Sequence, residues 1–283
     1  MELDQLRTLA AVTDTGSFEL AAEALTITPS AVSQRIKALE AQLGRGVLIR
    51  ARPCRPTQSG EVLLRLARRM LLLEAEALTE LGQPDVGPTQ ITIVVNSDSL
   101  ATWALPALTA VAQDHDVLLD IRREDQGLST ALLRDGTAMA AVTSVAQAVP
   151  GCRVRRLGAM RYHPMATAEF IERWFGDGVT PAALAAAPVI IFDRDDNLQD
   201  QWLRTRTHKR LDPPRHYVPE STSYVAAVRL GLGWGLVPTD QHSDDLIELV
   251  PDEVVEVPLF WQQWKLASPV LDALADALAY ACP

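Results

Sequence analysis

Apolar residues recur at helical spacing in two segments near the start of the chain, which predicts a small helical unit. Leucine and alanine side chains within residues 3–10 fall on one stripe. Val32, Ile36, Leu39 and Leu43 recur at intervals of four, three and four residues, which places them on one buried face of a later helix. The pattern of residues 17–44 therefore predicts two short helices joined by a tight turn.

The later helix should begin near Thr28, a residue type that caps helix N-termini, with Pro29 in its first turn. Its polar face carries hydroxyls, an amide and cations, which can bind phosphates and base edges in the major groove of DNA. An amphipathic helix in an ordinary bundle is the alternative, and the basic residues that follow argue against it. We predict DNA contacts from Thr28, Pro29, Ser30, Ser33, Gln34, Arg35 and Lys37.

The residues after this helix predict a basic hairpin, or wing. Residues 47–57 are β-prone and rich in turn formers, and no acidic residue occurs from Gln42 to Gly60. Such a hairpin beside a recognition helix can grip the neighbouring DNA backbone or minor groove. We expect Arg50, Arg52 and Arg55 to contact DNA there.

Residues 58–82 predict one helix of about 24 residues, roughly 36 Å long. A wide apolar stripe runs along it. Because the helix leaves a small domain, this stripe needs a partner surface. The partner is either the rest of the same chain or a second chain.

Residues 83–89, QPDVGPT, predict a linker. After it, strands near residues 91–96, 117–124 and 138–144 alternate with helices, and a second such series extends to residue 238. This order predicts parallel sheets with right-handed crossovers. Two α/β lobes joined by two crossing strands have the arrangement of periplasmic binding proteins. We place lobe I at about residues 90–161 and 265–283, and lobe II at about residues 162–264.

In such a pair of lobes a ligand binds where strand ends and helix N-termini face each other across a cleft. Hydroxyl and backbone N–H groups in residues 96–103 suit a carboxylate, and acids at other strand ends suit cations. Helix capping and solvation are the alternatives for any single position. The set predicts a site for a molecule with one carboxylate and two cationic groups, such as lysine or arginine. Its members are Asn96, Ser97, Asp98, Ser99, Thr102, Trp103, Asp125, Thr143, Asp193, Glu220 and Ser221.

The distribution of charge supports a basic DNA-binding part on an acidic body. The 283 residues carry a net charge of −10, but residues 30–70 hold nine basic and two acidic side chains. This stretch is therefore +7 and the remainder −17. A body that acidic favours a cationic ligand.

The sequence does not indicate other chemistry. Three distant cysteines and five scattered histidines offer no metal-ligand spacing, and no hydrolase motif occurs, so we expect no metal, no cofactor and no catalysis. The glycine-rich run at residues 231–235 follows a predicted helix, which indicates a turn and not dinucleotide binding. Without a signal peptide or a membrane-length apolar run, we expect a cytoplasmic protein with no membrane contact.

Several short motifs resemble LysR-type transcriptional regulators. They are Gly16-Ser17-Phe18, Ala21-Ala22, the run from Ser30 to Ile36, Leu39-Glu40, Leu43-Gly44 and Thr57-Gln58-Ser59-Gly60. The resemblance implies an α/β protein with an all-α-type winged helix-turn-helix head, residues 1–58, and a two-lobed, periplasmic-binding-protein-like effector domain. Pro29-Ser30 stands where many members have glutamine-proline, so no base preference is carried over.

The resemblance also implies a dimerising linker helix at residues 59–82, in a homodimer or homotetramer. Residues 96–103 and 192–196 resemble the lysine/arginine-responsive subgroup, whose members commonly activate an amino-acid exporter gene, with RNA polymerase as a further partner. Two alternatives stay open, namely a LysR-type regulator of another metabolite and a solute-binding module without DNA function. The expected dimer contacts are Leu63, Leu66, Met70, Leu73, Ala77 and Leu81.

Overall fold

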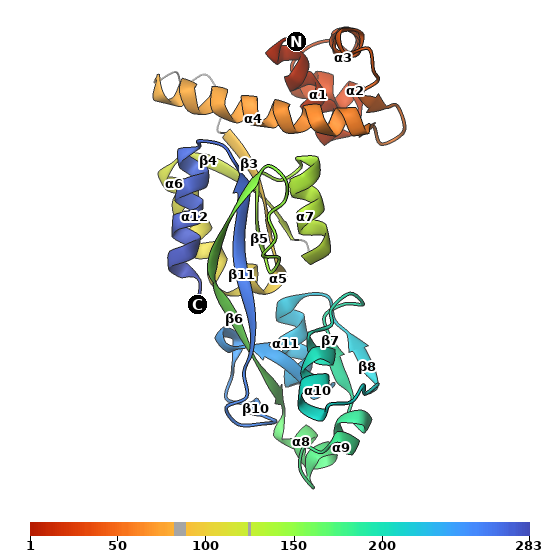
Figure 1. The fold of residues 1–283 in the computed structure, drawn as a ribbon, viewed down its shortest axis with the longest axis vertical. Helices are drawn as coiled ribbons and strands as arrows, with labels where there is room; N and C mark the ends of the chain where they lie inside the picture. Colours follow the sequence, from red (N-terminus) through yellow and green to blue (C-terminus); the bar gives the residue numbers. More distant parts are fainter. Residues whose placement is uncertain (82–88, 124–125) are drawn as a thin grey trace.

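Three helices and a short wing form the head of the molecule (Figure 1). The computed structural model describes residues 1–81, 89–123 and 126–283. The elements of the head are α1 (Leu3–Thr15), α2 (Phe18–Ala24), α3 (Pro29–Leu43), β1 (Leu48–Ile49) and β2 (Arg55–Pro56). Because β1 and β2 pair antiparallel, the predicted hairpin is confirmed together with the helices.

Local signals in the sequence set the bounds of α3. The hydroxyl of Thr28 accepts a hydrogen bond from the backbone N–H of Ala31 at 3.2 Å, so Thr28 caps the helix as predicted. Leu43, which we expected on the buried stripe, is 40% exposed because it is the last helical residue before the C-cap glycine. The buried core of the head includes Leu9, Val12, Val32, Ile36, Leu39 and Val47.

The long helix α4 (Gln58–Glu80) lies between the head and lobe I (Figure 1). Its first turn is close to the wing, since a Cβ atom at Gly60 would lie 3.0 Å from the carbonyl carbon of Val47. Further along, Leu63 joins the core of the head and Leu72 joins the core that continues through the lobes. One side of α4 therefore packs on its own chain.

Lobe I is built around parallel strands covered by helices. β3 (Thr89–Val95) pairs in parallel with β4 (Val117–Arg123) and β5 (Ala140–Thr143), which confirms the predicted alternation. Of the predicted linker, residues 83–88 lie outside the described residues. The helices are α5 (Ser97–Ser99), the π-helical turn η1 (Leu100–Ala104), α6 (Leu105–Asp114), α7 (Gln126–Asp135) and α12 (Pro269–Ala281).

Lobe II has a small parallel sheet of its own, formed by β7 (Val189–Ile191) and β8 (Arg215–Tyr217). The glycine-rich run forms the predicted turn after a helix, with φ +73 at Gly231. The other elements of lobe II are α8 (Ala168–Phe175), α9 (Pro181–Ala186), α10 (Leu198–Thr207), α11 (Ser221–Arg229), β9 (Gly235–Pro238), the 3-10 turn η2 (Thr239–Gln241) and β10 (Ile247–Glu248).

Two long strands, β6 (Cys152–Ala166) and β11 (Val255–Trp264), pair antiparallel and run through both lobes (Figure 1). Seven of the described strands thus share one sheet in the order β10-β6-β11-β5-β3-β4, with β9 beside β6. Residues 260–263, which we had placed in lobe II, pair with β5 of lobe I. Among the described residues, no helix is both long enough and apolar enough to cross a membrane.

Candidate DNA-binding face and effector cleft

The predicted DNA face of α3 is open to solvent. Pro29, Ser30, Gln34 and Lys37 are exposed, and Ser33 is partly buried. Since the apolar side of α3 packs into the head, these side chains stand on the opposite side of the helix. They offer hydroxyl, amide and ammonium groups, the types that bond phosphates and base edges.

Arg35, which we also expected to contact DNA, is engaged within the head. Its guanidinium donates to Asp4 Oδ2 at 2.9 Å and to the hydroxyl of Thr8 at 3.5 Å. Both partners lie on α1, so Arg35 ties the recognition helix to the first helix. Its contribution to DNA binding would therefore compete with a structural ion pair.

The cations of the wing are more accessible. Arg52 and Arg55 are exposed. Arg50 stands 5.6 Å above the centroid of the Phe18 ring, and its guanidinium lies 3.6 Å from a carboxylate oxygen of Glu40. Its side chain is still 51% exposed, so an ion pair this open contributes little and leaves the cation available to a phosphate.

The side of α4 turned away from its own chain carries an exposed apolar stripe. Leu66 and Met70 are each 38% exposed, Leu73 is 42% exposed and Leu81 is 71% exposed, with Ala77 also exposed between them. Their spacing of four, three, four and four residues keeps them on one side of the helix. The remaining predicted dimer contact, at residue 63, is buried in the core of its own head and does not belong to this stripe.

Residues from both lobes come into contact at the predicted cleft. The backbone N–H of Ser221, at the start of α11 in lobe II, donates to Ser97 Oγ of lobe I at 3.3 Å. Next to it, the hydroxyl of Tyr162 donates to Asp98 Oδ2 at 2.7 Å. Burial raises the pKa of Tyr162 well above its usual value, and the charge of Asp98 raises it further. Tyr162 therefore stays protonated, and its hydroxyl donates the hydrogen bond that holds the Asp98 carboxylate in place.

Two predicted carboxylates are used as caps within lobe II. Asp193 Oδ1 accepts hydrogen bonds from the backbone N–H groups two and three residues later, at 2.7 and 2.9 Å. Glu220 caps α11 by accepting from the N–H groups of Thr222 and Ser223 at 3.0 and 2.7 Å, and hydrogen bonds from Ser223 and Thr222 lower its pKa. Helix and turn capping, the alternative that we considered from the sequence, accounts for both.

Asp196 is a partly buried carboxylate that was not among the predicted site residues. Burial raises its pKa, although the backbone N–H groups of Leu198 and Phe192 donate to it, and the charges of Asp193 and Asp98 raise the pKa further. Asp98 of lobe I and Asp196 of lobe II thus lie within electrostatic reach of each other. The acidic run at residues 193–196 was the only signal in the sequence, and it does not tell which acid turns inward.

Three further predicted residues carry buried polar atoms that bond to no other described residue. They are Asn96 Oδ1, Ser99 Oγ and Trp103 Nε1, all at or just after the end of β3. An unsatisfied buried polar group costs about 1–3 kcal/mol, so such groups gain from a ligand that bonds to them. The end of β3 is therefore the part of lobe I best supplied with unused hydrogen-bonding groups.

The other predicted cleft residues have internal partners or are not described. The hydroxyl of Thr102 donates to the backbone carbonyl of Asp98 at 2.7 Å, which is a bond within the helical segment. The hydroxyl of Thr143 accepts from the N–H of Val145 at 3.2 Å, at the end of β5. Asp125 lies outside the described residues.

Two histidines and a glutamate meet in lobe II, although the histidines are scattered along the sequence. His163 lies on β6, His242 follows η2 and Glu248 lies on β10. Their potential ligand atoms all lie within 4.8 Å of one another. Because the three segments are far apart along the chain, no local spacing could have indicated this cluster.

Comparison with known proteins covers both parts of the chain. Residues 3–61 match the family described as "Bacterial regulatory helix-turn-helix protein, lysR family", and residues 87–283 match "LysR substrate binding domain". ArgP from Mycobacterium tuberculosis, a solved structure, has a TM-score of 0.86 and 47% identity over 98% of this chain and 96% of that one.

Two further relatives are similar over nearly their whole length. Full-length LysG from Corynebacterium glutamicum, solved with bound effector Arg, has a TM-score of 0.79 and 38% identity over 99% of this chain and 98% of that one. The "Lysine export transcriptional regulatory protein LysG" of Corynebacterium efficiens is 43% identical over 279 residues, which are 96% of this chain and 95% of the relative.

Proposed function

This chain belongs to the LysR family of bacterial helix-turn-helix transcriptional regulators, and from that premise we propose that it senses lysine or arginine between its two lobes. The resemblance inferred from the short motifs is thereby confirmed, and the relatives are named as regulators and not as enzymes. The arginine bound to the Corynebacterium glutamicum relative and the lysine-export name of the Corynebacterium efficiens relative support a basic amino acid as effector.

The observation that carries this proposal is the pair of carboxylates Asp98 and Asp196, which come from different lobes. Burial raises the pKa of Asp196, so its charged form is costly when no cation is near. A guanidinium or ammonium group between the two carboxylates would offset that cost and form charge-assisted hydrogen bonds with both. Tyr162 holds Asp98 in place for this contact.

The carboxylate end of the amino acid would bind where Ser97 and Ser221 meet. At the N-terminus of α11 the backbone N–H of Ser221 is directed toward this point, whereas the N–H groups of Thr222 and Ser223 are bonded to the Glu220 carboxylate. The 3.3 Å bond from Ser221 N to Ser97 Oγ links the lobes directly, and a ligand carboxylate would replace it with bonds to both lobes. Binding would then change how the lobes are held together.

We assign DNA binding to the exposed face of α3 and to the wing, and dimerisation to the exposed stripe of α4. Two heads could then bind two half-sites of a near-palindromic promoter, as a homodimer or in a homotetramer. Effector binding would act through α4 on the bound DNA. This requires that the effector bind more tightly to one of two conformational states of the protein, and a difference in binding free energy of a few kcal/mol is enough. We propose that the complex activates an amino-acid exporter gene in the cytoplasm, in contact with RNA polymerase.

Thermal-shift screening of the full chain with the twenty amino acids tests the effector. We expect lysine or arginine to raise the melting temperature, and a response to a non-basic solute alone would contradict the proposal. Titration calorimetry then compares Asp196→Asn with Asp195→Asn, its exposed neighbour. Because a hydrogen bond to a charged group contributes about 1.5–3 kcal/mol, Asp196→Asn should weaken binding roughly tenfold to a hundredfold. The Asp195 variant should bind like the original chain.

A further inference from the structure

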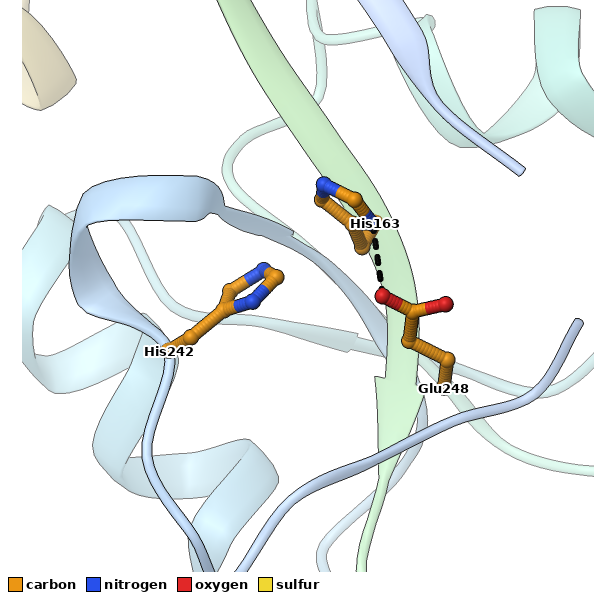
Figure 2. Close-up of side chains that lie close together, drawn as sticks. All are labelled: His163, His242 and Glu248. Carbon is orange, nitrogen blue, oxygen red and sulfur yellow. Dashed lines mark ion pairs between the residues drawn. The ribbon is translucent and has the colours of Figure 1, made fainter. Parts of the chain in front are cut away.

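Two histidines and a glutamate share one face of the sheet in lobe II. Glu248 on β10 pairs with Met165 of β6, two residues along from His163, so Glu248 and His163 are diagonal neighbours on the same side. His242 comes from the segment after η2, and Figure 2 shows its imidazole turned toward His163. Tyr162, the adjacent residue on β6, points to the opposite side, where it bonds Asp98 in the cleft.

The distances within this cluster are short. Nδ1 of His163 lies 2.9 Å from Oε1 of Glu248 (Figure 2). The centroids of the two imidazole rings are 4.5 Å apart, with an interplanar angle of 80°. His163 Nδ1 and His242 Nε2 are buried without a hydrogen-bond partner among the described residues, because the close approach to Glu248 lacks hydrogen-bond alignment. Two imidazole nitrogens therefore lie near a carboxylate without a hydrogen bond to any described residue.

The surroundings favour the neutral form of one of the two imidazoles, that of His242. The side chain of His163 is 13% exposed and that of Glu248 is 29% exposed, so water screens the cluster only in part. Burial lowers the pKa of His242, and the neighbouring His163 lowers it further. A neutral imidazole has the free lone pair that coordination needs.

We propose that His163, His242 and Glu248 form a binding site for a divalent transition metal, with Zn²⁺ as the ion that fits best. Two imidazoles and one carboxylate are a ligand set that zinc uses, with water in the fourth position. Mg²⁺ and Ca²⁺ fit poorly because they prefer oxygen ligands alone. Zinc bonds of about 2.0–2.1 Å separate tetrahedral ligands by roughly 3.3 Å. The present separations, up to 4.8 Å, must therefore close by roughly 1.5 Å at most, through rotation of the side chains.

A metal ion here would join three segments of lobe II. β6, β10 and the segment after η2 would become cross-linked on the reverse side of the strand that carries Tyr162 into the cleft. The site lies within one lobe and does not depend on effector or DNA.

Metal binding by the full chain tests this proposal. The protein is stripped with a chelator and dialysed against Zn²⁺, and its metal content is measured. We expect the original chain to bind one zinc ion. His242→Ala should lose this ion, and Glu248→Gln should bind it with lower affinity. Changes to groups outside the ligand shell already cost about 10–100-fold in affinity, so loss of a ligand should cost at least about 100-fold. His115→Ala removes an exposed histidine outside the cluster and should bind zinc like the original chain.

Co²⁺ provides a second measurement, because its visible absorption is intense in a four-coordinate site and weak in a six-coordinate one. An intense spectrum that is absent from His242→Ala and weaker in Glu248→Gln would support the proposal. Three results would overturn the proposal. They are an unchanged zinc content in His242→Ala and Glu248→Gln, zinc binding that disappears only when the cysteines are alkylated, and no zinc binding by the original chain. Circular dichroism verifies that each variant is folded. If His242→Ala is not folded, the result for Glu248→Gln decides, because this substitution keeps the size of the side chain.

Discussion

Gly136 of lobe I is in close contact with α4, and replacing it with alanine tests that contact. Gly136 has φ +84, and an added Cβ atom would overlap Cγ of Arg65 and lie 3.0 Å from its Cα atom. The carbonyl of Gly136 accepts a hydrogen bond from Arg68, which also pairs with Asp14 of α1. One residue of lobe I is therefore in contact with α4 and connected through Arg68 to the head.

The expected effect has two parts. A left-handed backbone costs a non-glycine residue about 1–2 kcal/mol. Forcing an extra carbon into a packed contact adds about 1–3 kcal/mol. Gly136→Ala should therefore lower the free energy of unfolding by about 2–5 kcal/mol. Gly178 provides the matched control, because it has φ +97 but a Cβ atom there would meet nothing within 4 Å. Gly178→Ala should cost only the first part.

Urea unfolding followed by tryptophan fluorescence measures both variants, since all six tryptophans lie in the lobes. A second assay compares DNA affinity with and without arginine. That ratio should approach one in Gly136→Ala and stay unchanged in Gly178→Ala, because only the former displaces α4. If the two variants lose the same stability within about 0.5 kcal/mol, α4 does not rest on Gly136 in solution and the argument is refuted.

Arg52→Ala in the wing should reduce the magnitude of the slope of log affinity for duplex DNA against log salt concentration by about 0.9, and Arg173→Ala in lobe II should leave this slope unchanged. If the Arg52 variant has the same slope as the original chain, the wing is not part of the DNA interface. Leu73→Asp on the α4 stripe should convert dimers to monomers in analytical ultracentrifugation, and Leu230→Asp, at a residue 86% exposed outside that stripe, should not; a dimeric Leu73 variant would place the contact elsewhere. Burial raises the folded-state pKa of Asp196, so its contribution to stability is complete below the unfolded-state pKa and is lost as pH rises through the raised value. The melting temperature of ligand-free Asp196→Asn should therefore rise relative to that of the original chain as pH rises toward neutrality. A difference in melting temperature that does not change with pH would show that burial does not raise the pKa of Asp196.

Features that depend on neighbours along the chain were predictable from the sequence. The start of α3 follows from a capping hydroxyl and a proline, the wing follows from β-prone residues between turn formers, and α4 follows from an unbroken run of strong helix formers. The two lobes follow from the alternation of strands and helices, because parallel strands need long crossovers. These signals are local or periodic, so they do not require knowledge of tertiary contacts.

The partners of individual polar side chains were decided by the tertiary structure alone. Arg35 bonds to Asp4 and Thr8 of α1, Glu220 caps α11, and burial raises the pKa of Asp196. His163 meets two residues from distant segments because β9 and β10 both flank β6. Sequence periodicity determines which side of a helix or strand a residue occupies, but the identity of the group that it meets depends on how distant segments pack, and that information is present only in the folded chain.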